Sequence, residues 1–268
     1  MNRFTRWAAA TLAALALLVS ATAPASAATP DWKPRPGAAW QWQLQGAIDL
    51  TPNVAAFDVD GFDTSAATVA KIHAKGAGAV CYISAGSFES WRPDAARFPA
   101  AVKGRDLDGW AGEKWLDIRR WDVLGPIMKS RMQMCAAKGF DAVEPDNVDG
   151  YANSTGFPLT SAQQITYNRN LAATAHSLGL AVALKNDVDQ LAALQPYFDF
   201  AINEECAEWN ECGAYRVFTA AGKAVWNVEY AADRFPAFCA TTRPIFGQAS
   251  MLKSYDLTAN PRKVCPSA

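Results

Sequence analysis

Short apolar segments alternate with longer helical segments along most of this 268-residue chain. The apolar segments predict strands at residues 54–60, 79–84, 115–118, 140–144, 180–185, 198–203 and 224–228, with a last one within 247–255, and the helical segments lie at 65–74, 123–138, 161–178 and 215–221. Strands that alternate with helices predict a parallel sheet covered by helices. Eight such units predict an α/β fold with a single (β/α)8 barrel, the TIM barrel. An open doubly wound sheet is the alternative, but no G-x-G-x-x-G motif follows the first strand.

The first 27 residues have the pattern of a secretory signal peptide. Arg3 and Arg6 flank the start of an apolar stretch at residues 7–19, and Ala25-Ser26-Ala27 is a small-x-small cleavage motif. The stretch is too short for a retained transmembrane helix, and no other apolar run approaches the length that spans a bilayer. We therefore expect a secreted, extracellular protein, with residues 28–268 forming one barrel domain.

The charge of the chain limits its partners. Once Arg3 and Arg6 are removed, 23 basic residues remain against 26 acidic ones, a net charge of −3. A slightly acidic chain without a Lys/Arg stripe is not expected to bind nucleic acid or an anionic membrane. We expect a monomer that needs no cofactor.

Six cysteines, an even number in an exported chain, predict three disulfides. Fifteen pairings are open in principle. The short spacing favours Cys206 with Cys212, and Cys239 with Cys265 would hold the C-terminus, which leaves Cys81 with Cys135. A zinc site is not indicated, because paired C-x-x-C units are missing and no histidine lies beside a cysteine.

Polar residues collect at the carboxyl ends of the predicted strands, which is where TIM barrels carry their active sites. The candidates for substrate binding are Asp58, Asp60, Tyr82, Asp117, Glu144, Asn147, Lys185, Asn186, Glu204 and Tyr230. Acids gathered at one cleft attract a cation, and an amino sugar carries one. Aromatic residues that could stack on sugar rings are Trp40, Trp42, Trp91, Trp110, Trp115, Tyr151 and Trp209, although most tryptophans are expected in the core.

Two carboxyl groups on either side of the bond are what glycosidic hydrolysis requires. Alternation along the strand at residues 140–144 points Glu144 and Asp146 toward the barrel mouth. In the strand at 198–203, the bulky apolar residues are assigned to the helix-facing side, which leaves Glu205 rather than Glu204 pointing inward; a bulge would shift this by one residue. Asp146 and Glu205 are therefore the predicted catalytic pair.

Other chemistries have less support. The chain has only two histidines, His73 and His176, and both lie in predicted helices, which argues against triads and histidine-based zinc sites. A carboxylate cluster could bind Ca²⁺, but no EF-hand loop is present. Lys185 could form a Schiff base as in aldolases, although a charge-paired lysine fits its acidic surroundings better. A carbohydrate-binding barrel without catalysis also remains an alternative.

Several runs resemble glycoside hydrolase family 114, the endo-α-1,4-polygalactosaminidases. They are Trp40-Gln41-Trp42-Gln43-Leu44, Phe57-Asp58-Val59-Asp60, Cys81-Tyr82-Ile83-Ser84-Ala85-Gly86, Trp115-Leu116-Asp117-Ile118-Arg119, residues 139–149 with Glu144-Pro145-Asp146-Asn147, Leu184-Lys185-Asn186, and residues 198–206 with Asn203-Glu204-Glu205-Cys206. The resemblance implies a TIM barrel that cuts α-1,4-linked galactosamine chains internally, with retention. It implies an Asp nucleophile after the fourth strand, Asp146, and a Glu acid/base after the sixth, Glu205 in preference to Glu204.

Overall fold

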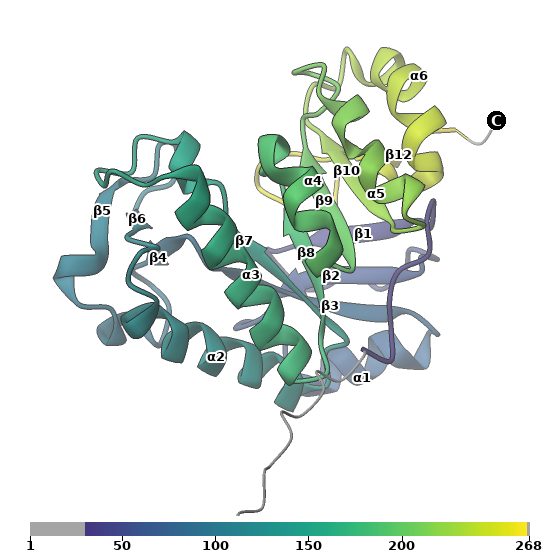
Figure 1. The fold of residues 1–268 in the computed structure, drawn as a ribbon. Coiled ribbons are helices and arrows are strands. Elements are labelled where there is room, and N and C mark those ends of the chain that lie inside the picture. The colour runs from purple at the N-terminus through teal and green to yellow at the C-terminus, as the bar shows by residue number, and fades with distance from the viewer. Residues whose placement is uncertain (1–29, 267–268) are drawn as a thin grey trace, which may run out of the picture.

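A nine-stranded sheet forms the centre of the molecule in the computed structural model, which describes residues 30–266 (Figure 1). Its spatial order is β1 (Trp40–Gln43), β2 (Ala56–Asp60), β3 (Gly78–Ser84), β7 (Ala142–Asp146), β8 (Ala181–Lys185), β9 (Phe200–Glu204), β10 (Val225–Glu229), β11 (Ser250–Leu252) and β12 (Lys263–Val264). All neighbours pair in parallel except β12, which is antiparallel to β11. The predicted signal peptide lies outside the described residues.

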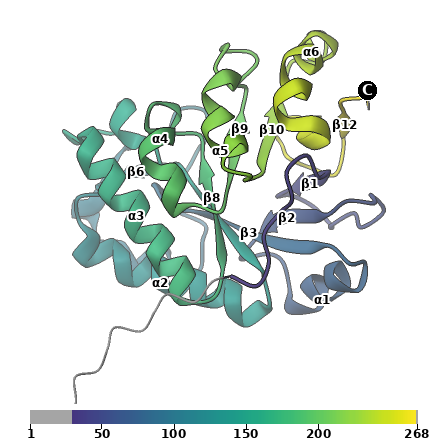
Figure 2. The ribbon, with the colours of Figure 1, turned by 45° about the vertical axis from the view of Figure 1, so that its right-hand side comes forward.

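The helices cover the outer face of this curled sheet (Figure 2). They are α1 (Ala66–Ala74), α2 (Trp121–Lys138), α3 (Ser161–Ser177), α4 (Leu191–Leu194), α5 (Arg216–Ala220) and α6 (Phe235–Phe246). Local sequence sets their ends: Thr160 and Gln163 form a capping box that begins α3, and Gly139 ends α2 with a left-handed φ of 88°. Within residues 30–266, the helices fall short of the length and apolar character that crossing a bilayer requires.

The inner face of the sheet is filled by aromatic side chains. Trp40 on the first strand of the sheet stacks on Trp226 of the seventh, with ring centroids 4.6 Å apart. These rings meet only because the sheet curls and both side chains point inward. The indole of Trp40 also donates a hydrogen bond to the carbonyl of Ala249, beside β11, at 2.8 Å, which joins the two ends of the parallel sheet. The predicted TIM-barrel fold is confirmed.

One predicted strand belongs to a different sheet. Residues 115–118 overlap β6 (Glu113–Leu116), which pairs antiparallel with β4 (Ser87–Glu89) and β5 (Lys103–Asp106). This β4–β6 insertion lies between β3 and α2 and projects to the left in Figure 1. The barrel strand that the prediction missed is β1, whose alternating Trp and Gln residues look half exposed in sequence although all four are buried.

The three predicted disulfides are present. Cys81 on β3 is joined to Cys135 on α2, Cys206 to Cys212 in the loop after β9, and Cys239 on α6 to Cys265. Each bond therefore fixes a helix or a loop to the sheet or to the C-terminal segment.

Candidate active site

Three carboxylates surround the ammonium group of Lys185 at the carboxyl ends of the parallel strands. Its Nζ lies 3.0 Å from Oδ1 of Asp146, 2.9 Å from Oε2 of Glu204 and 3.1 Å from Oε1 of Glu144. The Nζ atom also lies 4.6 Å from the ring centre of Trp42. The ends of β1, β7, β8 and β9 thus converge on one buried cation.

The ammonium of Lys185 remains charged in this position. Burial alone would lower its pKa, but Asp146, Glu204 and Glu144 raise the pKa of Lys185 well above its usual value. Schiff-base formation needs the neutral amine. The site therefore favours the ion-pair interpretation of Lys185 over the aldolase alternative.

Asp146 is held through both of its oxygens. Tyr82 donates its hydroxyl to Oδ2 at 2.9 Å, and Lys185 contacts Oδ1. Burial, followed by the charge of Asp146, raises the pKa of Tyr82 well above its usual value, so the phenol keeps its proton and donates. Asn147 follows with a left-handed φ of 61°, which turns the chain sharply after β7. The carboxylate is thus oriented from two sides.

Glu204 is the last residue of β9 and is also held through both oxygens. Besides the contact of Oε2 with Lys185, Oε1 accepts a hydrogen bond from Tyr230. The backbone N–H of Glu204 donates to Oδ1 of Asn186 at 2.9 Å. Tyr255 stacks on Tyr230 with ring centroids 4.0 Å apart. Two strands and an aromatic pair therefore fix this carboxylate opposite Asp146.

The predicted orientation of Glu205 is wrong. Its backbone has a left-handed φ of 63°, and its carboxylate accepts a hydrogen bond from Tyr255 at 2.8 Å in a cavity beside the cleft. The prediction assigned Phe200 to the helix-facing side of the strand. In the structure Phe200 packs edge-on against Trp226 inside the barrel, so Glu204 shares the inward face.

Asp58 and Glu144 lie beneath the site rather than in the cleft. Both are fully buried. Burial, and then the neighbouring Glu144, raise the pKa of Asp58 well above its usual value, so Asp58 carries a proton and donates it to Glu144. Burial raises the pKa of Glu144 itself to about 7. Glu144 contacts Lys185, and neither Asp58 nor Glu144 lines the substrate cleft.

Two further predicted substrate-binding residues have structural partners instead. Asp60 accepts two hydrogen bonds from Arg92, at 3.0 and 2.6 Å. Asp117 follows β6 in the insertion, and both of its oxygens accept from Arg119, at 2.7 and 2.8 Å. Asp117 was assigned to the barrel rim because β6 was read as a barrel strand. Neither residue lines the central cleft.

The central cleft has a volume of about 280 Å³. Of the predicted residues it contains Tyr82, Asp146, Asn147, Lys185, Asn186, Glu204 and Tyr230. It also contains acidic and aromatic residues that the prediction did not assign as substrate-binding, namely Asp108, Glu113, Asp149 and Tyr255. Five acidic side chains and one basic side chain line it. Asp108 and Glu113 come from the β4–β6 insertion, whose position against the barrel no local sequence pattern reveals.

Aromatic residues line the cleft and its edges. Trp42 and Trp115 are buried in its walls, whereas Trp110 is 45% exposed at its margin. Trp91, which is 54% exposed, lines an adjoining cavity, and Trp209, which is 66% exposed, lines another on the Glu205 side. Trp40 is a core residue.

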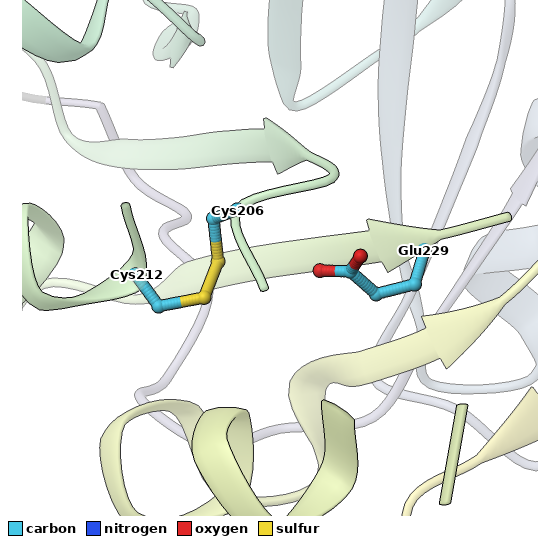
Figure 3. Close-up of side chains that lie close together, drawn as sticks. All are labelled: Cys206, Cys212 and Glu229. Atoms are coloured by element: carbon cyan, nitrogen blue, oxygen red, sulfur yellow. A yellow bond between two sulfur atoms is a disulfide. The ribbon is translucent and has the colours of Figure 1, made fainter. Parts of the chain in front are cut away.

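Within residues 30–266, one group of side chains is close enough together to hold a metal ion, formed by Cys206, Cys212 and Glu229. Figure 3 shows that the two sulfur atoms are bonded to each other. Because zinc and similar ions bind the thiolate form, the disulfide removes two of the three ligands. This group does not form a metal centre.

A parallel barrel with two carboxylates held across one cleft is the arrangement of a glycoside hydrolase. The chain matches the model of glycoside-hydrolase family GH114 over residues 21–267 and belongs to this family. The resemblance noted in the sequence is thereby confirmed.

The chain is also similar to solved structures and to a sequence relative. The chain is 35% identical to Ega3 of Aspergillus fumigatus, solved in complex with galactosamine, over 88% of this chain and 98% of that chain, with a TM-score of 0.83. The glycoside hydrolase domain of PelA from Pseudomonas aeruginosa shares the fold, with a TM-score of 0.62 and 14% identity over 84% of this chain and 96% of that chain. An uncharacterised protein of Deinococcus radiodurans is 27% identical over 75% of this chain and 76% of its own.

Proposed function

We propose that this enzyme cuts α-1,4-linked galactosamine chains internally, with Asp146 as nucleophile and Glu204 as acid/base. The observation that carries the proposal is the Lys185 ammonium held between these two carboxylates. This arrangement supports one carboxyl group on each side of a sugar ring that is bound in the cleft. Glu204 replaces Glu205 as the partner of Asp146, because only Glu204 contacts Lys185.

The spacing of the pair supports retention. The Asp146 and Glu204 oxygens that contact Lys185 are separated by at most the sum of the two distances, 5.9 Å. Retaining enzymes place the two groups about 5–5.5 Å apart, whereas inverting enzymes need about 6.5–9.5 Å for a water molecule. Asp146 then attacks the anomeric carbon while Glu204 protonates the departing oxygen. In the second step Glu204 takes a proton from a water molecule whose oxygen attacks the anomeric carbon, and the bond between that carbon and Asp146 breaks.

The cleft supports a cationic substrate that runs through it. Its five acidic side chains outnumber Lys185, which is already paired, so a positive charge on the sugar would be attracted. The cleft shares Tyr82, Trp110 and Glu113 with one adjoining cavity and Asp149, Glu204 and Tyr255 with another. A polymer could therefore continue past the Asp146–Glu204 pair on two sides, as internal cleavage requires. Galactosamine bound to Ega3, which is 35% identical, supports the choice of sugar.

We also propose that the enzyme is exported after removal of residues 1–27 and acts as a monomer of one domain, residues 28–268. Three disulfides are typical of proteins from oxidising compartments.

The test uses the mature enzyme and its Asp146→Asn variant with α-1,4-galactosamine oligomers of defined length. The wild-type enzyme should release shorter oligomers. NMR should show that the new reducing ends first have the same α configuration as the bond that was cut. The variant should lose activity by on the order of 10⁴-fold and still bind the oligomer. A folded wild-type protein that binds the oligomer without cutting it would instead support a carbohydrate-binding barrel.

A further inference from the structure

Glu113 supplies a third carboxyl group to the cleft, and the proposed reaction does not use it. It is the first residue of β6 and lies where the central cleft meets an adjoining cavity of about 440 Å³. Its side chain is placed by the insertion and not by a barrel strand. Only 6% of the residue surface is exposed. A carboxyl group so well buried at the wall of a binding cleft needs a partner.

A chain of polar contacts connects Glu113 with the proposed nucleophile. Oε2 of Glu113 accepts from the hydroxyl of Ser87 at 2.6 Å. The Ser87 hydroxyl lies 3.4 Å from Nδ2 of Asn147, which is 3.5 Å from Oδ2 of Asp146. This is the oxygen of Asp146 that faces away from Lys185. Oε2 of Glu113 is therefore separated from Oδ2 of Asp146 by at most the sum of these distances, 9.5 Å, and both residues line the same cleft.

The other oxygen of Glu113, Oε1, has no hydrogen-bond partner in the protein among residues 30–266, since the bond from Ser87 goes to Oε2. Arg92, whose positive charge acts on Glu113, is already engaged by Asp60 and Glu89. Burial, together with the charges of Glu89 and Asp146, raises the pKa of Glu113 to about 7, although the Ser87 hydrogen bond and the charge of Arg92 lower it. A positively charged group of a ligand would stabilise the ionised form of Glu113.

We propose that Glu113 binds the ammonium group at C2 of the sugar whose anomeric carbon Asp146 attacks. The proposal rests on the function proposed above and names the residue that recognises the free amine of the substrate. C2 is bonded to the anomeric carbon, so its substituent extends from the attacked position into the cleft that Glu113 lines. Lys185, also beside Asp146, is a cation and cannot bind this group. An N-acetylated sugar carries no charge at C2 and gains nothing from Glu113.

The experiment compares Glu113→Gln with the wild-type enzyme on two substrates of equal length, an α-1,4-galactosamine oligomer and its fully N-acetylated counterpart. Glutamine keeps the size of the side chain and an acceptor for Ser87 but removes the charge. On the free-amine oligomer, kcat/KM should fall about 10- to 100-fold, mainly through KM. On the acetylated oligomer it should stay the same or rise. Equal losses on both substrates, or no loss on the free amine, would overturn the proposal.

Asp233→Asn is the control, because Asp233 is exposed and lines neither the central cleft nor its adjoining cavities. It removes the same formal charge and should alter the rates on the two substrates equally, by less than about threefold, since water screens an exposed charge. If Glu113→Gln does not fold, Glu113→Asp replaces it. That variant keeps the charge and should keep the preference for the free amine at reduced affinity; loss of the preference contradicts the proposal.

Binding separates this proposal from the proposed function. Calorimetry with Asp146→Asn, with and without Glu113→Gln, measures the affinity for the free-amine oligomer where no cleavage occurs. If the wild-type enzyme cuts no polymer, the proposed function fails, yet an affinity loss of about 10- to 100-fold on removing the Glu113 charge still supports the amine site. Unchanged affinity overturns it.

Discussion

Two adjacent glutamates after β9 occupy different surroundings. Glu204 contacts Lys185 and Tyr230 inside the cleft, whereas Glu205 is bonded to Tyr255 in the adjoining cavity. We expect Glu204→Gln to lower kcat by about 10²- to 10⁴-fold, because it removes the proton donor. Glu205→Gln should change kcat by less than about threefold, since an exposed hydrogen bond contributes little.

A substrate with a good leaving group checks the role of Glu204. An aryl α-galactosaminide with a nitrophenolate leaving group needs little protonation, so Glu204→Gln should retain far more activity on it than on the oligomer. Glu205→Gln serves as the matched control, with one carboxyl group removed one residue away. A larger loss in Glu205→Gln than in Glu204→Gln would restore the original assignment of the acid/base to Glu205.

At the scale of single residues, polar residues at the ends of predicted strands were enough to predict most of the candidate site. Tyr82, Asp146 and Lys185 were predicted because each lies at or near the carboxyl end of a parallel strand, and parallel strands present these ends at one rim. The error at Glu205 came from Phe200. Large aromatic residues fill the interior of this barrel, so side-chain size does not tell the inner face from the helix-facing one.

Elements outside the barrel were the hardest to predict. The run Trp115-Leu116 is as apolar as a barrel strand, and its antiparallel pairing with β4 depends on residues far away in the sequence. Glu113 was missed for the same reason, since its place in the cleft follows from where the β4–β6 insertion packs. The disulfide pairing was easier to predict. The short spacing of Cys206 and Cys212 and the C-terminal position of Cys239 and Cys265 left one pairing for the remaining two cysteines.

The disulfides should contribute unequally to stability. The bond from Cys81 to Cys135 spans 54 residues and joins β3 to α2 across the insertion, whereas Cys206 and Cys212 are 6 residues apart. Cross-linking a longer loop removes more entropy from the unfolded chain. We expect replacing the first pair by alanine to lower the free energy of unfolding by about 4 kcal/mol, and replacing the second by about 2 kcal/mol.

Urea unfolding of the two double variants measures this difference. The comparison is internally matched, because each variant loses two sulfur atoms from buried positions. Equal losses, or a larger loss for the short loop, would show that local packing and not loop length governs the contribution of these bonds.

On the scale of the whole molecule, the sequence predicted the barrel well because seven of the eight apolar segments are barrel strands. It did not predict how many acids the fold would bury around the cleft. Burial is the largest cause that raises the pKa of Glu113 and Glu144 to about 7, of Asp149 to about 6 and of Asp187 to about 8. In the unfolded chain these carboxyl groups return to about 4.

The folded protein therefore binds more protons than the unfolded chain between about pH 4 and pH 8, and its stability falls as the pH rises through this window. Asp199 acts in the opposite direction, because hydrogen bonds with His176 and Lys33 lower its pKa despite burial, so its contribution is lost on acidification. We expect the free energy of unfolding in urea to be larger at pH 5 than at pH 8. Asp187→Asn, which keeps an acceptor for Asn168, should reduce the slope between pH 6 and pH 8. A stability that is flat or rises across this range would contradict the raised pKa values.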